Sequence, residues 1–383
     1  MGKPKILARF RPWDQELLEK FCQKKSRDSV RVSMLPRFGF SGARLFIVNF
    51  TERGLPEILK VAPFDKAKEE FEALHSMRDI GVEDCTRVCD ANEQLLVSNS
   101  REWGAIVYPH MGTDQTAAAE DSVTLKQRLF LAGGELGALS DATLKATLNE
   151  IFERLENAHR DPNWKSCRLQ KVYGAYFRQH KSQIRIRQIL GRLAEKQVFS
   201  FLGADLYNPL KLIDSIPKFA RLPMGRVHGD LHPDNVVLHR FGTPHLIDFA
   251  WAKNERDILV DFVLMENSIR FRDFPRTVNL EEQLPVDDAL AQNGSFSDVQ
   301  TFSSRDGKNR SAYKRLASIL SVIRRSAKNA LGNGFSVERY LFCQFILLYG
   351  LIRYDGYEPY TSVRALGMMA KRLHQTRWDF LDI

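Results

Sequence analysis

The stretch Val227–Ala252, VHGDLHPDNVVLHRFGTPHLIDFAWA, sets many polar side chains beside two short apolar runs. The runs NVVLH and HLIDF predict two strands, and RFGTP between them predicts a turn. The polar side chains in question are His228, Asp230, Asp234, Asn235 and Asp248. Unpaired buried carboxylates are costly, so a bound cation or substrate is the first explanation for them.

Three of these residues have a spacing that suits a metal site and a base. Asn235 follows Asp230 across a loop, and Asp248 ends the second predicted strand. A hairpin of this length can return Asp248 beside Asn235, which would give two oxygen ligands of the kind that magnesium prefers. Asp230 would then face a substrate hydroxyl.

Upstream, Lys60 lies inside the apolar predicted strand EILKVA, where a buried ammonium needs an anionic partner. The following predicted helix offers Glu69, Glu70 and Glu72. We favour Glu70, because Leu74 and Met77 then fall on the adjoining core face. The alternative is a lysine that extends from an edge strand to solvent.

The segment RFGFSGARLFIV joins two predicted strands through Gly39, Phe40, Ser41 and Gly42. Glycines there would let the backbone approach phosphates and offer its N–H groups, although a simple hairpin is the alternative. No G-x-x-x-x-G-K-[ST] motif occurs in the chain.

Transfer of a phosphoryl group from ATP needs a phosphate clamp, magnesium ligands and a carboxylate that orients the accepting hydroxyl. The chain presents candidates for all three, in that order. The sequence therefore predicts an ATP- and Mg²⁺-dependent phosphotransferase that acts on an alcohol group.

The motif HGDLHPDNVVL…HLIDFA resembles the catalytic loop and metal-binding segment of the aminoglycoside phosphotransferase and choline kinase-like branch of the protein-kinase fold. The resemblance implies an α+β, two-lobed fold with a small antiparallel-sheet N-lobe and a mostly helical C-lobe. It implies that Asp230 is the catalytic base, that Asn235 and Asp248 hold magnesium, and that Glu70 orients Lys60 on the ATP phosphates.

The same resemblance implies that adenine bonds to the backbone near Ile106, Val107 and Tyr108. GFSGARLFIV and DFVLMENSIRF are also similar to segments of kinase-like domains in bacterial conflict systems, the ternary-complex-associated group. Where protein kinases have a lysine two residues after the catalytic aspartate, this chain has His232, which favours the small-molecule branch.

Much of the net charge of +9 lies between Arg160 and Lys196, which hold ten basic and two acidic residues. Four of them recur every seven residues and predict one side of a helix: Lys171, Arg178, Arg185 and Arg192. A solvated helix face and an anion-attracting surface both stay open. An aminoglycoside acceptor is not expected, because a polycation would meet a basic segment.

We expect an N-terminal helix in residues 1–28, a nucleotide-binding N-lobe in 29–110 and a catalytic, substrate-binding C-lobe in 111–383, with an irregular loop at 281–310. No apolar run has the length of a signal peptide or a membrane span, so a cytoplasmic protein is expected. Cys85 and Cys89 have no second pair to complete a zinc site.

Three alternatives differ in class from a phosphotransferase. The chain could be a catalytically weak ATP-binding module in signalling or assembly, or it could transfer an adenylyl group on the same fold. Nucleic-acid binding is less favoured, because few aromatic residues are interleaved with the basic ones. The acceptor and the oligomeric state do not follow from the sequence.

Overall fold

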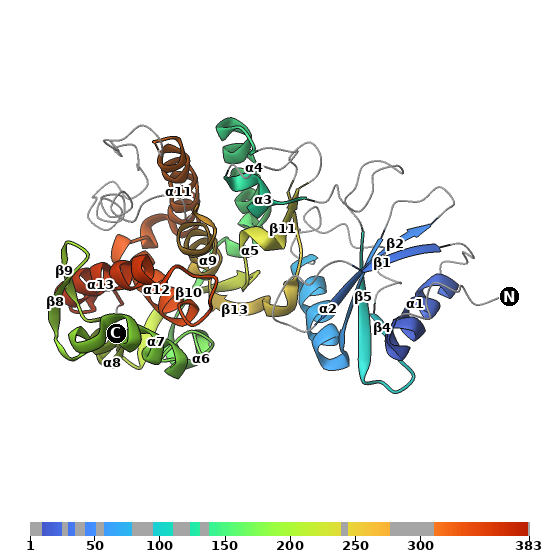
Figure 1. The fold of residues 1–383 in the computed structure, drawn as a ribbon, viewed down its shortest axis with the longest axis horizontal. Coiled ribbons are helices and arrows are strands. Elements are labelled where there is room, and N and C mark those ends of the chain that lie inside the picture. The colour runs from blue at the N-terminus through green and yellow to red at the C-terminus, as the bar shows by residue number, and fades with distance from the viewer. Residues whose placement is uncertain are drawn as a thin grey trace. The chain divides into compact units, whose positions relative to one another are not determined.

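The computed structural model describes residues 10–24, 30–34, 43–50, 57–78, 95–109, 123–130, 138–238, 244–275 and 310–381. The chain divides into two compact units (Figure 1). Unit 1 comprises Met1–Arg128 and Asp234–Lys253, and unit 2 comprises Leu129–Pro233 and Asn254–Ile383. The boundaries of an N-lobe and a C-lobe drawn from the sequence remain predictions.

Unit 1 is built on a five-stranded antiparallel sheet of order β1-β2-β3-β5-β4. Its strands are β1 (Val30–Met34), β2 (Arg44–Phe50), β3 (Glu57–Pro63), β4 (Leu95–Val97) and β5 (Trp103–Pro109). Helix α2 (Phe64–Arg78) follows β3 directly. Asp65 lies within the first turn of this helix.

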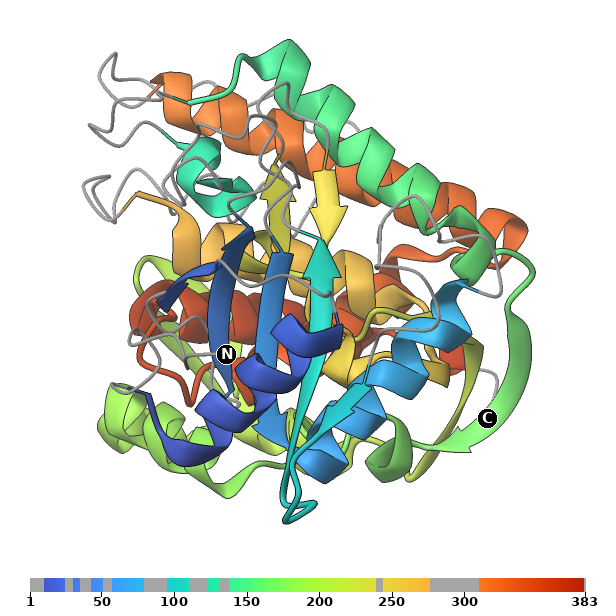
Figure 2. The same cartoon turned by 90° about the vertical axis from the view of Figure 1, so that its right-hand side faces the viewer.

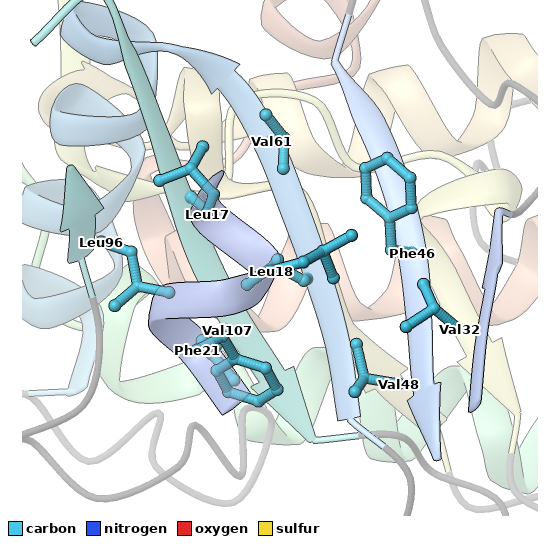
Figure 3. Packing of buried hydrophobic residues seen from close by; sticks show 11 residues of the cluster. Leu17, Leu18, Phe21, Val32, Phe46, Val48, Val61, Leu96 and Val107 are labelled. Carbon is cyan, nitrogen blue, oxygen red and sulfur yellow. The ribbon is translucent and has the colours of Figure 1, made fainter. Parts of the chain in front are cut away.

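Helix α1 (Pro12–Lys24) covers one face of this sheet and crosses its strands (Figure 2). Its Leu17, Leu18 and Phe21 are buried against side chains of the strands (Figure 3). Leu59 and Val61 of β3 belong to the same cluster. Because successive side chains of a strand alternate between faces, Lys60 between them points to the opposite face.

A second, smaller sheet in unit 1 has the order β12-β11-β6. It combines β6 (Val123–Thr124) with β11 (Val236–Leu238) and β12 (Pro244–Leu246), the two strands predicted from the quoted stretch. The short helices η5 (Pro233–Asn235) and η6 (Phe249–Trp251) flank this hairpin, and α3 (Leu125–Leu129) follows β6.

Unit 2 is mostly helical. Its helices are α4 (Asp141–Arg154), α5 (Glu156–His159), α6 (Leu169–Val172), α7 (His180–Leu190), α8 (Pro209–Ser215), α9 (Leu259–Ser268), α11 (Arg310–Leu331), α12 (Val337–Leu351) and α13 (Pro359–Gln375). Every residue of α9 is buried, and so is every residue of α12 from Arg339 onward, so these two helices form the centre of the unit. Helices α4 and α11 lie side by side (Figures 1 and 2).

Strands interrupt the helices of unit 2. They are β7 (Asn163–Arg168), β8 (Val198–Phe201), β9 (Ala204–Tyr207), β10 (Phe219–Val227) and β13 (Lys253–Asp257), and β10 pairs with both β7 and β13. Among the described residues, no helix combines the length and the apolar character needed to cross a membrane.

The single helix expected from the spacing of Lys171, Arg178, Arg185 and Arg192 is wrong. The segment instead forms β7, α6, a turn, α7 and the short helix η4 (Gly191–Glu195). Arg178 and Gly191 have φ of 52° and 54°, in the left-handed region that a continuous α-helix excludes. The repeat of basic residues therefore does not line one helix face.

Candidate functional site

Lys60 is the centre of a buried ion cluster in unit 1. Its side chain is 5% exposed, and its Nζ lies 2.7 Å from Glu70 Oε2 and 2.8 Å from Asp248 Oδ1. Tyr108 donates a hydrogen bond from its hydroxyl to Glu70 Oε1. Glu70 comes from α2 and Tyr108 from β5, so the face of the sheet opposite α1 collects these groups.

Burial alone would lower the pKa of Lys60, but Glu70 and Asp248 raise it above its ordinary value. The lysine therefore stays charged. When all three groups are ionised, two carboxylates face one ammonium, and the cluster has a net negative charge. Burial, together with Glu70, raises the pKa of Tyr108 well above its ordinary value, so its hydroxyl stays a donor.

Asn235 and Asp248 lie at the same end of the β11–β12 hairpin. Val236 pairs with Leu246, and the Asn235 carbonyl accepts a hydrogen bond of 3.0 Å from the Ile247 N–H. Asp248 is the next residue, with φ of 64° and ψ of 65°. A left-handed conformation is costly for a residue other than glycine, and such strain concentrates at functional sites.

The side chains at this end of the hairpin fit a magnesium ion. They supply a carboxylate and an amide, the hard oxygen donors that magnesium prefers. Asp248 is 24% exposed, and its Oδ1 contacts Lys60 Nζ. Burial raises the pKa of Glu70, and a cation beside Asp248 would favour the ionised form of both carboxylates. Among the described residues, no group of three or more His, Cys, Asp or Glu side chains forms a denser metal site.

Ile106, Val107 and Tyr108 lie on β5, opposite Lys60, Leu59 and Ile58 of β3. On its other side, β5 pairs with β4 only from Gly104 to Ile106. Beyond Ile106, this side of β5 has no strand partner among the described residues. The backbone at Val107 and Tyr108 is therefore better suited than that at Ile106 to bond a planar ligand.

Asp230 lies in unit 2, in the loop that follows β10. Its side chain is 30% exposed, with Oδ2 3.7 Å from His232 Nε2. The loop is held from behind by Asp261 of α9, whose carboxylate accepts hydrogen bonds of 2.8 Å from the His228 and Gly229 N–H groups. Gly229 has φ of 80°, which a glycine adopts without strain.

His159 of α5 also contacts Asp261, with 3.0 Å between His159 Nε2 and Asp261 Oδ2. Burial opposes the ionisation of Asp261, but its hydrogen bond with His159 and the charges of His159 and His228 hold its pKa below the ordinary value. His159 carries no motif that would have singled it out in the sequence. Asp261 could have been found from its place near the start of an apolar helix. The same place also suits a helix cap, so the pattern alone does not assign it to the Asp230 loop.

Several residues singled out in the sequence lie outside the described residues. They are the glycine segment Gly39, Phe40, Ser41 and Gly42, the cysteines Cys85 and Cys89, and most of the 281–310 segment. Their parts in the site stay predictions.

Five of the ten basic side chains of the Arg160–Lys196 segment contact neighbouring acceptors. Arg160 pairs with Glu156, Lys165 with Glu255 and Arg187 with Glu195. Arg185 contacts Asp355 at 2.7 Å, and Arg178 donates to the carbonyl groups of Asp214 and Ile216. These contacts weaken the interpretation of the whole segment as an anion-attracting surface.

Comparison with known proteins gives two likenesses. Residues 171–346, less than half of the chain, match the family model described as Ternary complex associated domain 9. No curated protein matches the chain.

Similar solved structures are phosphotransferases. They include a choline kinase, LicA, from Streptococcus pneumoniae (15% identity over 91% of this chain and 98% of that one, TM-score 0.33). A thermostable mutant of aminoglycoside phosphotransferase APH(4)-Ia has 13% identity over 91% and 98%, with a TM-score of 0.40. A Plasmodium vivax ethanolamine kinase has 11% identity over 93% and 84%, with a TM-score of 0.37.

Both resemblances stated from the sequence are confirmed, to the aminoglycoside phosphotransferase and choline kinase group and to the ternary-complex-associated group. The α+β class is confirmed by the antiparallel sheets of unit 1 and the mostly helical unit 2. The identities and TM-scores are low, so they do not say what this chain binds or catalyses.

Proposed function

We propose that this chain is an ATP- and magnesium-dependent phosphotransferase with a hydroxyl group as acceptor. The observation that carries the proposal is the ion cluster of Lys60 with Glu70 and Asp248, at the end of a hairpin that also holds Asn235. A buried lysine that shares two carboxylates can turn toward the phosphates of a bound nucleotide when a cation takes its place on Asp248.

Each residue then has one role. Lys60, oriented by Glu70, binds the ATP phosphates, and Asn235 and Asp248 hold magnesium, which neutralises charge on the phosphates. The backbone near Val107 and Tyr108 bonds adenine, and the Gly39–Gly42 segment covers the phosphates. Asp230 of unit 2 orients the acceptor hydroxyl and takes its proton as the new oxygen–phosphorus bond forms and ADP leaves.

The stiffness of the Asp230 loop supports this role for Asp230. A base must be held in place, and two N–H groups next to Asp230 are fixed by the buried Asp261. The contacts leave the Asp230 carboxylate accessible, at 30% exposure. We place His228 in a structural role, because its N–H is bonded to Asp261 and its Nδ1 lies 3.4 Å from the Asp230 N–H.

Transfer from γ-labelled ATP into the components of a cell extract tests the activity. Asp230→Asn keeps the shape of the side chain and removes the base, so single-turnover transfer should fall by about 10²- to 10⁴-fold while calorimetric ATP binding survives. Asp205→Asn, at an exposed aspartate of the same unit, is the matched control and should transfer like the wild type.

Transfer at the wild-type rate by Asp230→Asn would remove Asp230 from the mechanism. Label that moves from α-labelled and not from γ-labelled ATP would replace phosphoryl with adenylyl transfer. ATP binding without movement of either label would identify a binding module.

A further inference from the structure

Arg256, on β13, is a buried arginine without an anionic partner. It is 4% exposed, and its Nη1 has neither solvent contact nor a hydrogen-bond partner. No ion pair of Arg256 occurs within the part of the chain that the structure describes. Since a buried guanidinium that lacks a partner is costly, its retention needs a reason.

Other buried arginines of unit 2 show how this cost is normally met. Arg324 binds both oxygens of Glu266, at 2.9 and 2.7 Å. Arg339 donates to the carbonyl groups of Arg221 and Phe380. Unlike Arg324 and Arg339, Arg256 donates no hydrogen bond to a carboxylate or a carbonyl group of the described residues.

Arg256 lies on β13, which pairs with β10, and Asp230 lies in the loop that follows β10. The Arg256 Cζ lies 5.9 Å from the ring centre of the buried Tyr176. Burial and the charge of Asp230 raise the pKa of the Tyr176 hydroxyl, while Arg256 lowers it. The Tyr176 hydroxyl is thus within electrostatic range of both Asp230 and Arg256.

A second buried tyrosine, Tyr357, is also affected by the charge of Asp230. Tyr357 is buried, its hydroxyl lies 3.1 Å from Ser268 Oγ, and its pKa is raised by burial and, less strongly, by Asp230. The Asp230 carboxylate itself stays partly exposed. Two buried tyrosines of unit 2 therefore lie within electrostatic range of Asp230, and Arg256 lies beside one of them.

We propose that Arg256 anchors the acceptor by binding an anionic group, a phosphate or a carboxylate, that the acceptor carries beside its reacting hydroxyl. Tyr176 forms the wall between this anion and Asp230 and offers its hydroxyl as a donor. Arginine suits the task because its planar fork binds two oxygens at once. The proposal rests on the proposed function and specifies its acceptor class.

Arg256 is also a better candidate than the Arg160–Lys196 segment for binding an anionic acceptor. Four of the ten basic side chains of that segment pair with carboxylates, whereas Arg256 forms no ion pair among the described residues. A single desolvated arginine attracts an anion more strongly than solvated surface charges do, because the local dielectric is lower.

The test uses four small probes: glycerol 3-phosphate, glycerate, neutral glycerol and cationic choline. Their binding to the full chain is measured by calorimetry in the presence of Mg–ADP. The wild type should bind glycerol 3-phosphate or glycerate and should show no binding of glycerol or choline at the same concentration. The two anions distinguish a phosphate from a carboxylate as the anchored group.

Arg256→Gln should weaken binding of the anionic probe by about tenfold or more, since a charged hydrogen-bonding group is lost. Arg256→Lys, which keeps the charge but not the fork, should weaken it less. Arg192→Gln, at an exposed arginine of the basic segment, is the matched control and should bind within about twofold of the wild type. Melting temperatures check that each variant is folded, and Arg256→Lys serves alone if Arg256→Gln does not fold.

The proposal is overturned if no anionic probe binds the wild type, if glycerol binds equally well, or if Arg192→Gln weakens binding as much as Arg256→Gln. It is also overturned if Arg256→Gln spares the anionic probe and weakens Mg–ATP instead, which would place the arginine on the transferred phosphate. Failure of the proposed function has a different signature, since anion binding would persist without phosphoryl transfer and without an effect of Asp230→Asn.

Discussion

At the scale of single residues, the pKa values of two buried carboxyl groups of unit 2 shift in opposite directions because their partners differ. Burial would raise the pKa of Glu266, but Arg324 and Arg270 lower it to about 2. Tyr340 and Gln344 donate further hydrogen bonds to Glu266. Glu266 is therefore a structural anion at neutral pH, a role that the sequence pattern alone did not assign.

Asp257 shows the opposite behaviour. It is buried, and burial raises its pKa to about 6, although hydrogen bonds from the neutral Tyr173 hydroxyl and the Leu259 N–H lower it. Arg339 and Arg256 lower the pKa of Asp257 less strongly, and neither forms an ion pair with it within the described part of the chain. The carboxyl group therefore holds its proton in the folded state at pH values where the unfolded chain has lost it.

The contribution of Asp257 to the free energy of unfolding should therefore fall as the pH rises from about 4 to about 6. In that interval the folded state binds more protons at Asp257 than the unfolded state does, so this contribution has a negative slope with pH, whereas the lowered pKa of Glu266 contributes a positive slope at its acid end. Asp257→Asn removes the titrating group, so the difference between the wild-type and variant profiles should fall by an amount on the order of 2 kcal/mol across the interval. Denaturant unfolding across this pH series measures both proteins.

Asp205→Asn, at an exposed aspartate, is the control for this profile and should keep the wild-type slope. A profile of Asp257→Asn with the same slope as the wild type would show that Asp257 does not titrate in this interval.

At the scale of elements, helix α12 packs closely against the turn after α6, with Gly350 against Tyr176. A Cβ placed on Gly350 would lie 2.4 Å from the Tyr176 Cα and 2.6 Å from its Cβ. The Gly350 carbonyl also accepts a hydrogen bond of 3.4 Å from Ser182 of α7. The glycine thus sets how closely α12 approaches the backbone that carries Tyr176.

Gly350→Ala should destabilise unit 2 by about 1–3 kcal/mol, because the added methyl group meets backbone atoms that cannot move aside. Helix propensity alone predicts the opposite sign, a gain of up to about 1 kcal/mol. The sign of the change in denaturant unfolding therefore separates close packing from propensity.

Gly356→Ala is the matched control, since its Cβ would lie 3.4 Å from the Arg272 Cγ, an ordinary contact. Its stability should stay within about 0.5 kcal/mol of the wild type. If Gly350→Ala proves as stable as this control, the close approach of α12 does not exist in solution.

At the scale of the whole molecule, the residues of the proposed site belong to both units of the chain. The chain passes from one unit to the other after Arg128, Pro233 and Lys253. The passage after Pro233 separates Asp230, in unit 2, from Asn235 and Asp248, in unit 1. A ligand held by unit 1 should therefore stabilise that unit directly.

Mg–ATP should raise the melting temperature of the wild type, because a ligand that binds only the folded state stabilises it by mass action, by about 2.7 kcal/mol at 100 times its Kd. Asp248→Ala should lose most of the magnesium-dependent part of this shift. Differential scanning fluorimetry with ATP alone and with Mg–ATP measures both parts.

Glu69→Gln, one residue from Glu70 but exposed, is the control and should respond like the wild type. An identical shift with and without magnesium in all three proteins would exclude the magnesium site at Asn235 and Asp248.

Much of the fold followed from local pattern. Leu17, Leu18 and Phe21 recur at helical spacing and lie buried in α1, and the apolar runs at residues 43–50 and 57–62 form β2 and β3. Side-chain periodicity reports which face of an element is buried, so the elements and the opposite orientation of Lys60 could be read from it. The hairpin that returns Asp248 to Asn235 could be predicted from strand length and a turn.

The tertiary structure alone decided which distant side chains meet. The contact of Asp261 with the His228 and Gly229 N–H groups, the enclosure of Glu266 by Arg324, and the unpaired state of Arg256 all depend on how separate helices pack. A heptad of basic residues predicted one helix, and left-handed residues at Arg178 and Gly191 broke it. Local periodicity specifies a face but not its partner, because the partner is selected by burial and charge compensation across the whole unit.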